Sequence, residues 1–330
     1  TAHYPLELSS AASDVYKRQS EDVAALDPDN RDWALEVVYA HHNLAVLALE
    51  AGDLDVADEG FQGEVRSMRQ IINDDPSPAN KQDLADAISG LGNIYLERGQ
   101  LVESLEYYEE SVNLLTPVLA EDPGNAVKRR DLAQARQTVF DVELLLGNTD
   151  RAAKINASVL DTFSALTTLD PGNLDWRRSL ANATLQRAHV LKAMKDNAKA
   201  YKEIQEAIRI YDGIDSAQDD VFVRSQSAEA QLLMAQLALR AGEVDVAARA
   251  ISLARDEIDY VAKGDRLNHW RLSLLVTILT VEGLIQSRSG DAESAQQYWK
   301  EAAELLRTKA ADSASPYVSN ARGFLAEATK

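Results

Sequence analysis

The residue types that most often carry chemistry are sparse and scattered in this sequence. Cysteine is absent, which excludes disulfides and thiolate metal sites. His41 and His42 are adjacent, but neighbouring helical positions point in different directions and no second pair at ligand spacing lies nearby, so we expect no metal site. Serines are numerous, yet none lies in a Gly-x-Ser-x-Gly elbow. We therefore expect neither catalysis nor a bound cofactor in this chain.

Two further sequence patterns and the net charge argue against a bound dinucleotide, a membrane span and a nucleic-acid partner. Residues 90–93, Gly-Leu-Gly-Asn, resemble half of a dinucleotide fingerprint, but they follow no predicted strand and lie inside a predicted helix. The most apolar run, residues 272–281, is about half as long as a bilayer span and is assigned to the core. The net charge of −19 argues against nucleic acid and anionic membranes. This charge would steer a basic partner, or it simply keeps a long helical surface soluble.

Two landmarks recur along the chain at intervals of about 48 residues, which indicates a helical-repeat protein. The first is a turn that usually contains Asp-Pro and then Asn. The second is a Gly followed by a polar residue. Because the Pro turn ends one helix and a Gly at the C′ position ends another, each interval holds two helices. The turns start at Asp27, Asp75, Asp122, Asp170, Asp219 and Gly264, and the second landmark lies at Gly52, Gly99, Gly147, Lys195, Gly242 and Gly290.

A small residue follows the second landmark by five positions in every interval, and a mostly bulky residue lies four positions further on. A small side chain at a fixed place on the second helix lets the two helices of a pair approach closely. The small residues are Ala57, Ser104, Ala152, Ala200, Ala247 and Ala295, and the later positions hold Phe61, Tyr108, Asn156, Ile204, Ile251 and Trp299.

This pattern resembles the tetratricopeptide repeat. The second interval matches it best, with Leu91, Gly92 and Tyr95 on the first helix and Ser104 and Tyr108 on the second. The interval exceeds the usual ~34 residues because both helices are longer. The resemblance implies an all-α, right-handed α-solenoid of about six helix pairs with a C-terminal capping helix.

In three intervals a tryptophan lies near the start of the first helix. This feature makes the pattern similar to the elongated repeats of large bacterial signalling proteins. These residues are Trp33, Trp176 and Trp270, and we expect them to pack between repeats. In such proteins a kinase, TIR or winged-helix module and one transmembrane helix often precede the repeats.

We expect three segments along the chain. Residues 20–314 form the repeat array and residues 315–330 the capping helix. Residues 1–19 do not fit the repeat, and residues 14–19 resemble the translated end of a transposon adapter, so we expect this segment to be foreign to the array or disordered. Residues 20–26 have the pattern of a second helix without its first, so we expect the natural chain to extend upstream.

The resemblance also implies a binding surface. In tetratricopeptide arrays, residues that flank the Leu-Gly pair on the first helices line a concave groove for a peptide. Asparagine suits this groove because its side chain both donates and accepts hydrogen bonds. The Lys and Arg set that binds a terminal carboxylate in chaperone-binding members is absent, which argues against such a ligand. The matching positions are His42, Asn43, Asn93, Glu97, Asn182, His189 and Gln236.

Three functions are compatible with these observations. We favour a protein-protein interaction scaffold that binds a peptide or protein in the groove. The alternative is the sensory or regulatory C-terminal segment of a bacterial transmembrane signalling protein whose effector domain lies outside this sequence. The third is an enzyme that uses the groove as a substrate cleft, which would require a deeply buried, unpaired acid-base pair there. The sequence does not distinguish the bacterial cytoplasm from the periplasm, and it predicts no oligomeric state.

Overall fold

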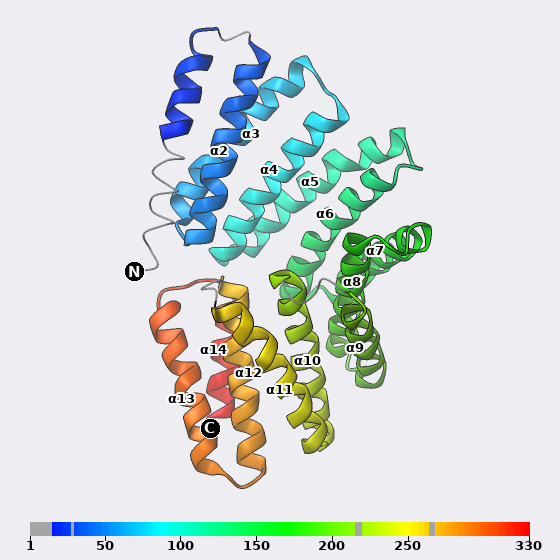
Figure 1. The fold of residues 1–330 in the computed structure, drawn as a ribbon, viewed down its shortest axis with the longest axis vertical. Helices are drawn as coiled ribbons and strands as arrows, with labels where there is room; N and C mark the ends of the chain where they lie inside the picture. The colour runs from blue at the N-terminus through cyan, green and yellow to red at the C-terminus, as the bar shows by residue number, and fades with distance from the viewer. Residues whose placement is uncertain (1–14, 28–29, 215–219, 264–267) are drawn as a thin grey trace. The chain divides into compact units, whose positions relative to one another are not determined.

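The computed structural model describes residues 15–27, 30–214, 220–263 and 268–330. Within these ranges all regular structure is helical, and no strand occurs (Figure 1). The chain divides into an N-terminal part that ends at Val142 and a C-terminal part that begins at Glu143. Each part is described by itself below.

The expected all-α alternation of first and second helices is confirmed. We call the first helix of each repeat the A helix and the second the B helix. The A helices are α2 (Arg31–Ala51), α4 (Pro78–Glu97), α6 (Ala126–Leu145), α8 (Leu174–Ala193), α10 (Val221–Ala241) and α12 (His269–Arg288). The B helices are α3 (Leu54–Asp74), α5 (Leu101–Glu121), α7 (Thr149–Leu169), α9 (Asn197–Asp212), α11 (Val244–Lys263) and α13 (Ala292–Lys309), and α14 (Pro316–Ala328) follows them. The boundary between the two parts falls inside α6.

The residues of the turns fix where the helices begin. At two A helices, Asn30 and Asn173 accept hydrogen bonds from the backbone N–H groups of Trp33 and Trp176, at 3.3 and 3.1 Å. Asp53 caps the B helix α3 in the same way. These side chains satisfy amide groups that a helix start leaves without an intrahelical partner. The turn residues of the repeat pattern therefore act as N-caps.

The residues at the second landmark adopt the left-handed backbone conformation that ends a helix. Within the described residues, five glycines have positive φ angles, from 74° at Gly99 to 87° at Gly290. Lys195 holds the sixth position of this series and has a φ of 64°. A side chain costs free energy in this conformation because its Cβ approaches the following carbonyl oxygen. The backbone at Lys195 is thus strained where the other repeats have glycine.

We expect Lys195→Gly to raise the free energy of unfolding by about 0.5–1 kcal/mol, because glycine adopts a positive φ without the steric cost. The Lys195 side chain is exposed, so the substitution removes little packing. Lys202→Gly is the matched control, since the exposed Lys202 lies inside α9 and glycine there should lower stability by about 1 kcal/mol. Urea denaturation of both variants measures the two changes. A loss of stability at Lys195 as well would contradict the assigned conformation.

The core lies between the A and B helices of each pair. Two of the small residues, Ala152 and Ala200, are 0% exposed. Ser104 is equally buried, and its hydroxyl on α5 donates to the Gly92 carbonyl on α4 at 2.8 Å. A Cβ atom at Gly92 would lie 2.5 Å from the Tyr108 ring, so glycine is required for this ring to pack there. The small, Leu-Gly and aromatic positions are therefore contacts within one helix pair.

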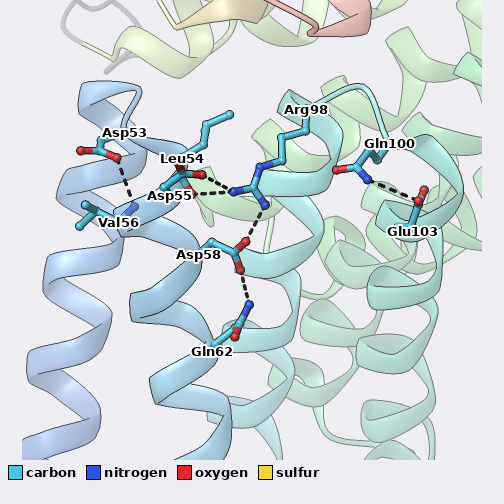
Figure 2. A network of polar contacts seen from close by, with 9 residues as sticks. All are labelled: Asp53, Leu54, Asp55, Val56, Asp58, Gln62, Arg98, Gln100 and Glu103. Atoms are coloured by element: carbon cyan, nitrogen blue, oxygen red, sulfur yellow. Dashed lines mark hydrogen bonds and ion pairs between the residues drawn. The ribbon is translucent and has the colours of Figure 1, made fainter.

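Arg98 joins two successive repeats in the N-terminal part. It follows α4, and its guanidinium donates to Asp55 at 2.8 Å and to Asp58 at 2.5 Å, both near the start of α3 (Figure 2). Asp58 also accepts a hydrogen bond from Gln62 at 2.7 Å. The end of one A helix is thereby held against the preceding B helix.

The most apolar run of the sequence, residues 272–281, lies in α12. Val276, Ile278 and Leu279 are fully buried there, which confirms the assignment to the core. In the ranges that the structure describes, no helix combines the length and the apolar character needed to cross a bilayer.

The last helix, α14, packs against α12 through a buried stripe that includes Val318 and Leu325. Arg322 on α14 donates to the Ala311 carbonyl at 2.9 Å, which ties the helix to the end of α13. Ser315 occupies the N-cap position, but its side chain makes no capping hydrogen bond. α14 thus covers an A helix that would otherwise expose its apolar side.

A helix over residues 15–24 precedes α2. Glu21 on this helix lies 3.1 Å from His41 Nε2 on α2. The helix is continuous across the boundary that we expected at Gln19, and residues 1–14 lie outside the described residues. The assignment of that boundary stays a prediction.

We expect deletion of residues 1–19 to change the free energy of unfolding by less than about 1 kcal/mol, since isolated ion pairs with exposed partners contribute little. The deletion removes an ion pair of Lys17 with the exposed Glu59 at 3.8 Å and a hydrogen bond from Tyr16 to Glu36. Thermal unfolding followed by circular dichroism compares the two chains. A fall of several kcal/mol would show that the segment belongs to the array.

Candidate ligand-binding groove

The A helices of the C-terminal part form one layer with α14, because α8 contacts α10, α10 contacts α12, and α12 contacts α14. Side chains from these four helices surround a cavity of about 270 Å³. The apolar part of its wall comes from α10, α12 and α14, and so does the uncharged polar part. The apolar residues are Leu232, Leu233, Trp270, Leu274, Ala321 and Phe324, and the uncharged polar ones are Gln236, Ser273, Thr277, Tyr317 and Asn320.

Two of the predicted site residues, His189 and Gln236, line this cavity. His189 Nε2 on α8 lies 3.1 Å from the Glu229 carboxylate on α10. Gln236 Oε1 on α10 accepts a hydrogen bond from Lys192 Nζ on α8 at 2.8 Å. Both contacts connect the same two A helices and position the polar side chains at the cavity.

Lys192 is the lysine that lines the cavity, and its surroundings disfavour its charge. Burial, together with the positive charge of Arg240, lowers the pKa of Lys192 to about 8, and Glu229 opposes this shift. An ammonium group has three N–H donors, and Gln236 accepts from one of them. Among the described residues, no carboxylate forms an ion pair with Lys192.

The predicted residue Asn182 is not brought into the cavity. It lies on α8 two turns before His189, it is half-buried, and it is not among the lining residues. Of the three predicted residues in this part of the chain, the structure therefore places His189 and Gln236 at the cavity.

Twelve of the fourteen lining residues were not predicted as site residues from the sequence, among them Lys192, Glu229 and Trp270. Lys192 follows His189 by three positions and thus lies on the same face of α8. Glu229 precedes Gln236 by seven positions, or two helical turns, so helical spacing from the predicted residues could have indicated both. Trp270, which we expected to pack between repeats, lines the cavity.

The other four predicted residues lie in the N-terminal part, on α2 and α4. His42 Nδ1 lies 3.2 Å from both carboxylate oxygens of Glu64, and this hydrogen bond raises the pKa of His42. Asn93 accepts a hydrogen bond from the Tyr108 hydroxyl at 2.6 Å. The remaining two are Asn43, which is exposed, and Glu97, which is half-buried. His42 and Asn93 are thus engaged by other side chains of the protein.

A larger cavity of about 490 Å³ lies in the N-terminal part among α3, α4 and α5, and none of the predicted residues lines it. The rings of Tyr95 and Tyr107 lie 5.1 Å apart in it. Arg69 on one wall pairs with Glu110 on the opposite wall at 2.8 Å. Because two of the predicted residues line the cavity of the C-terminal part and none lines this one, we place the candidate site in the C-terminal part.

The comparisons with known proteins agree on the fold. No protein-family model matches the sequence, and no curated protein matches it. The chain is similar to BtubC (BKLC) from P. vanneervenii, with a TM-score of 0.58 and 17% identity, covering 78% of this chain and 92% of that one. It is also similar to a Rap protein in complex with competence and sporulation factor, with a TM-score of 0.54 and 11% identity, covering 98% and 99%.

A third similar structure is a signal transduction ATPase (STAND protein) with a tetratricopeptide repeat sensor, from Pyrococcus horikoshii. The TM-score is 0.52 at 12% identity, and the likeness covers 98% of this chain and 44% of that chain. The chain has the tetratricopeptide-repeat fold. At these identities the likeness concerns the fold alone. Within this tetratricopeptide-repeat array, the candidate site lies on the A-helix layer, where α14 packs beside the last A helix.

Proposed function

We propose that the chain is a protein-interaction scaffold that binds a peptide or protein segment at the cavity among α8, α10, α12 and α14. The observation that carries this proposal is the cavity itself, in which four helices combine an apolar wall with a few hydrogen-bonding side chains. This combination is typical of ligand sites, and drug-sized ligands occupy roughly 300–1,000 Å³. A volume of about 270 Å³ suits one anchoring side chain of a longer segment.

The position of the lining residues supports binding by a preformed site. They lie on helices that pack against one another, so few groups need to be ordered when a ligand binds. The similar Rap protein was crystallised with competence and sporulation factor, so a protein of this fold class holds a separate molecule. We extend that property to this chain as part of the proposal.

The polar groups of the cavity favour binding over catalysis. His189 and Glu229 could form an acid-base pair, but their side chains are 26% and 23% exposed and they face each other at 3.1 Å. A catalytic pair would instead need an open position for the substrate between the two groups. We therefore include no catalytic step in the proposed function.

A peptide-display selection tests the proposal. Asn320 lines the cavity from an exposed position, so Asn320→Trp should block it with little effect on folding. The adjacent Ser319 is exposed and does not line the cavity, so Ser319→Trp is the matched control. We expect the wild-type protein to select linear peptides that bind Ser319→Trp equally and Asn320→Trp weakly or not at all. Peptides that bind all three proteins alike would place the site elsewhere.

We propose as a second candidate that the array is the sensory or regulatory segment of a larger bacterial signalling protein. The observation that favours it is the P. horikoshii structure, in which a tetratricopeptide repeat sensor belongs to a chain more than twice as long as the matched region. The genomic reading frame upstream of Ser20 tests it. An apolar run of about 20 residues behind an effector domain would support this role, and a frame that encodes only more repeats after a start codon would contradict it.

A further inference from the structure

We propose that the segment bound at the cavity presents a carboxylate to Lys192 next to an apolar side chain that contacts Trp270 and Phe324. This inference rests on the proposed function and specifies the chemistry of its ligand. The two features lie together because the ammonium and both aromatic rings line the same cavity.

The first argument is the incomplete set of partners around the Lys192 ammonium. Gln236 accepts one hydrogen bond at 2.8 Å, and in the described part of the chain no carboxylate pairs with this lysine. Charged groups withdrawn from water are normally paired, because an unpaired charge there is costly. A ligand carboxylate would accept the remaining N–H groups in short, charge-assisted hydrogen bonds.

The second argument is the charge of the groups around Lys192. From α10, Arg240 adds a positive charge and Glu229 a negative one, and the Glu229 carboxylate lies 3.1 Å from His189 Nε2 on α8. Lys192 and Arg240 together supply two positive charges against this one carboxylate. The lining residues from α12 and α14 have no carboxylate, ammonium or guanidinium group. The lysine end of the cavity is therefore locally suited to an anion, although the whole chain carries a net charge of −19. At physiological ionic strength, distant exposed charges are screened beyond about 8 Å.

The third argument is the apolar wall that adjoins the lysine. Leu232, Leu233 and Leu274 line the cavity together with the two aromatic rings. An apolar ligand side chain would bury surface against this wall, while the adjacent carboxylate reaches Lys192. The proposed site uses one lysine on a single A helix. It therefore differs from the Lys and Arg set of the chaperone-binding members, which lies on several A helices. The carboxylate could belong to an Asp or Glu side chain or to the C-terminus of the segment.

Two display libraries distinguish these sources. In one the random peptides end in a free carboxylate, and in the other their C-termini are fused to the carrier. Each is selected at 0.15 M salt against the wild-type protein, Lys192→Met and the control Lys202→Met, which removes an exposed lysine on α9 outside the cavity. We expect the wild type and the control to enrich peptides with a carboxylate beside an apolar residue, and Lys192→Met to lose this preference. Enrichment in the first library alone would identify the C-terminus, and enrichment in both would identify a side chain.

Affinities of the selected peptides complete the test. Changing the carboxylate to an amide should weaken binding to the wild type by about tenfold, the usual order for a hydrogen bond to a charged group. The same change should have no effect on binding to Lys192→Met or to Lys192→Gln, and melting curves establish that both variants fold. If Asn320→Trp weakens the binding of the selected peptides but these peptides show no preference for a carboxylate, this inference is overturned and the proposed function stays intact. The absence of any peptide sensitive to Asn320→Trp would overturn both.

Discussion

Replacing Ala200 with phenylalanine is expected to lower the free energy of unfolding by about 2–3 kcal/mol, the upper part of the range for inserting a large side chain into a packed core. Ala200 on α9 is 0% exposed, and it belongs to the same core cluster as Leu185 and Ala188 of α8. The ring has no space between the two helices, so α8 and α9 must separate or adopt strained rotamers. Because each repeat packs on its neighbours, the substitution should weaken the adjoining repeats as well.

Urea denaturation and amide hydrogen exchange measure this effect. Ala198→Phe is the matched control, since Ala198 is exposed two positions earlier on α9, and its change should stay within about 0.5 kcal/mol. Exchange should accelerate in α8 and α9 for the Ala200 variant. An unchanged unfolding transition for Ala200→Phe would mean that the register of this helix pair is wrong.

Replacing Lys192 with methionine is expected to stabilise the protein at pH 7 by about 1–2 kcal/mol. The pKa of Lys192 is lowered from its ordinary value of 10.5 to about 8, because burial penalises the charged form. At 1.36 kcal/mol per pH unit the full shift would correspond to roughly 3 kcal/mol. The expected gain is smaller because Lys192 is partly exposed and solvent screens its charge, and because the variant lacks the hydrogen bond to Gln236.

The pH dependence of this difference follows from the direction of the pKa shift. Below about pH 8 the folded protein holds the charged ammonium at its full cost. Between pH 8 and 10.5 the unfolded chain binds this proton more strongly than the folded chain, so the wild-type protein gains stability as the pH rises. The methionine variant lacks this contribution, so its stability advantage should shrink as the pH rises from 8 to 10.5. Chemical denaturation at a series of pH values measures it, and a difference that does not change with pH would contradict the assigned burial.

The local features of the fold were predictable from the sequence. The turn at Asp27 and the landmark at Gly52 bracket α2 (Arg31–Ala51), because Asn30 caps its first turn and Gly52 ends it in the left-handed conformation. These are interactions between residues a few positions apart, so their signals are contiguous in the sequence. Lys195 fills the place of glycine in this landmark series, and the structure shows that it shares the positive φ.

One exception in the repeat pattern needed the structure for its explanation. Asn156 holds a position where most repeats have a bulky apolar residue, and it is 2% exposed. Its amide nitrogen donates to the Ala183 carbonyl of the following A helix at 2.8 Å. A buried amide requires such a partner, and the sequence contains no local sign of which carbonyl supplies it.

The sequence by itself determined the period, the helix pairs and the small residues between them, because caps, turns and helical spacing depend on near neighbours. The tertiary structure decided which polar side chains meet at a cavity and which are engaged within the protein. Gln236 meets Lys192 from 44 positions away along the chain, whereas His42 is engaged by Glu64 and Asn93 by Tyr108. The physical reason is that burial and the partners of a polar group depend on the packing of separate helices, which helical periodicity on one element does not specify.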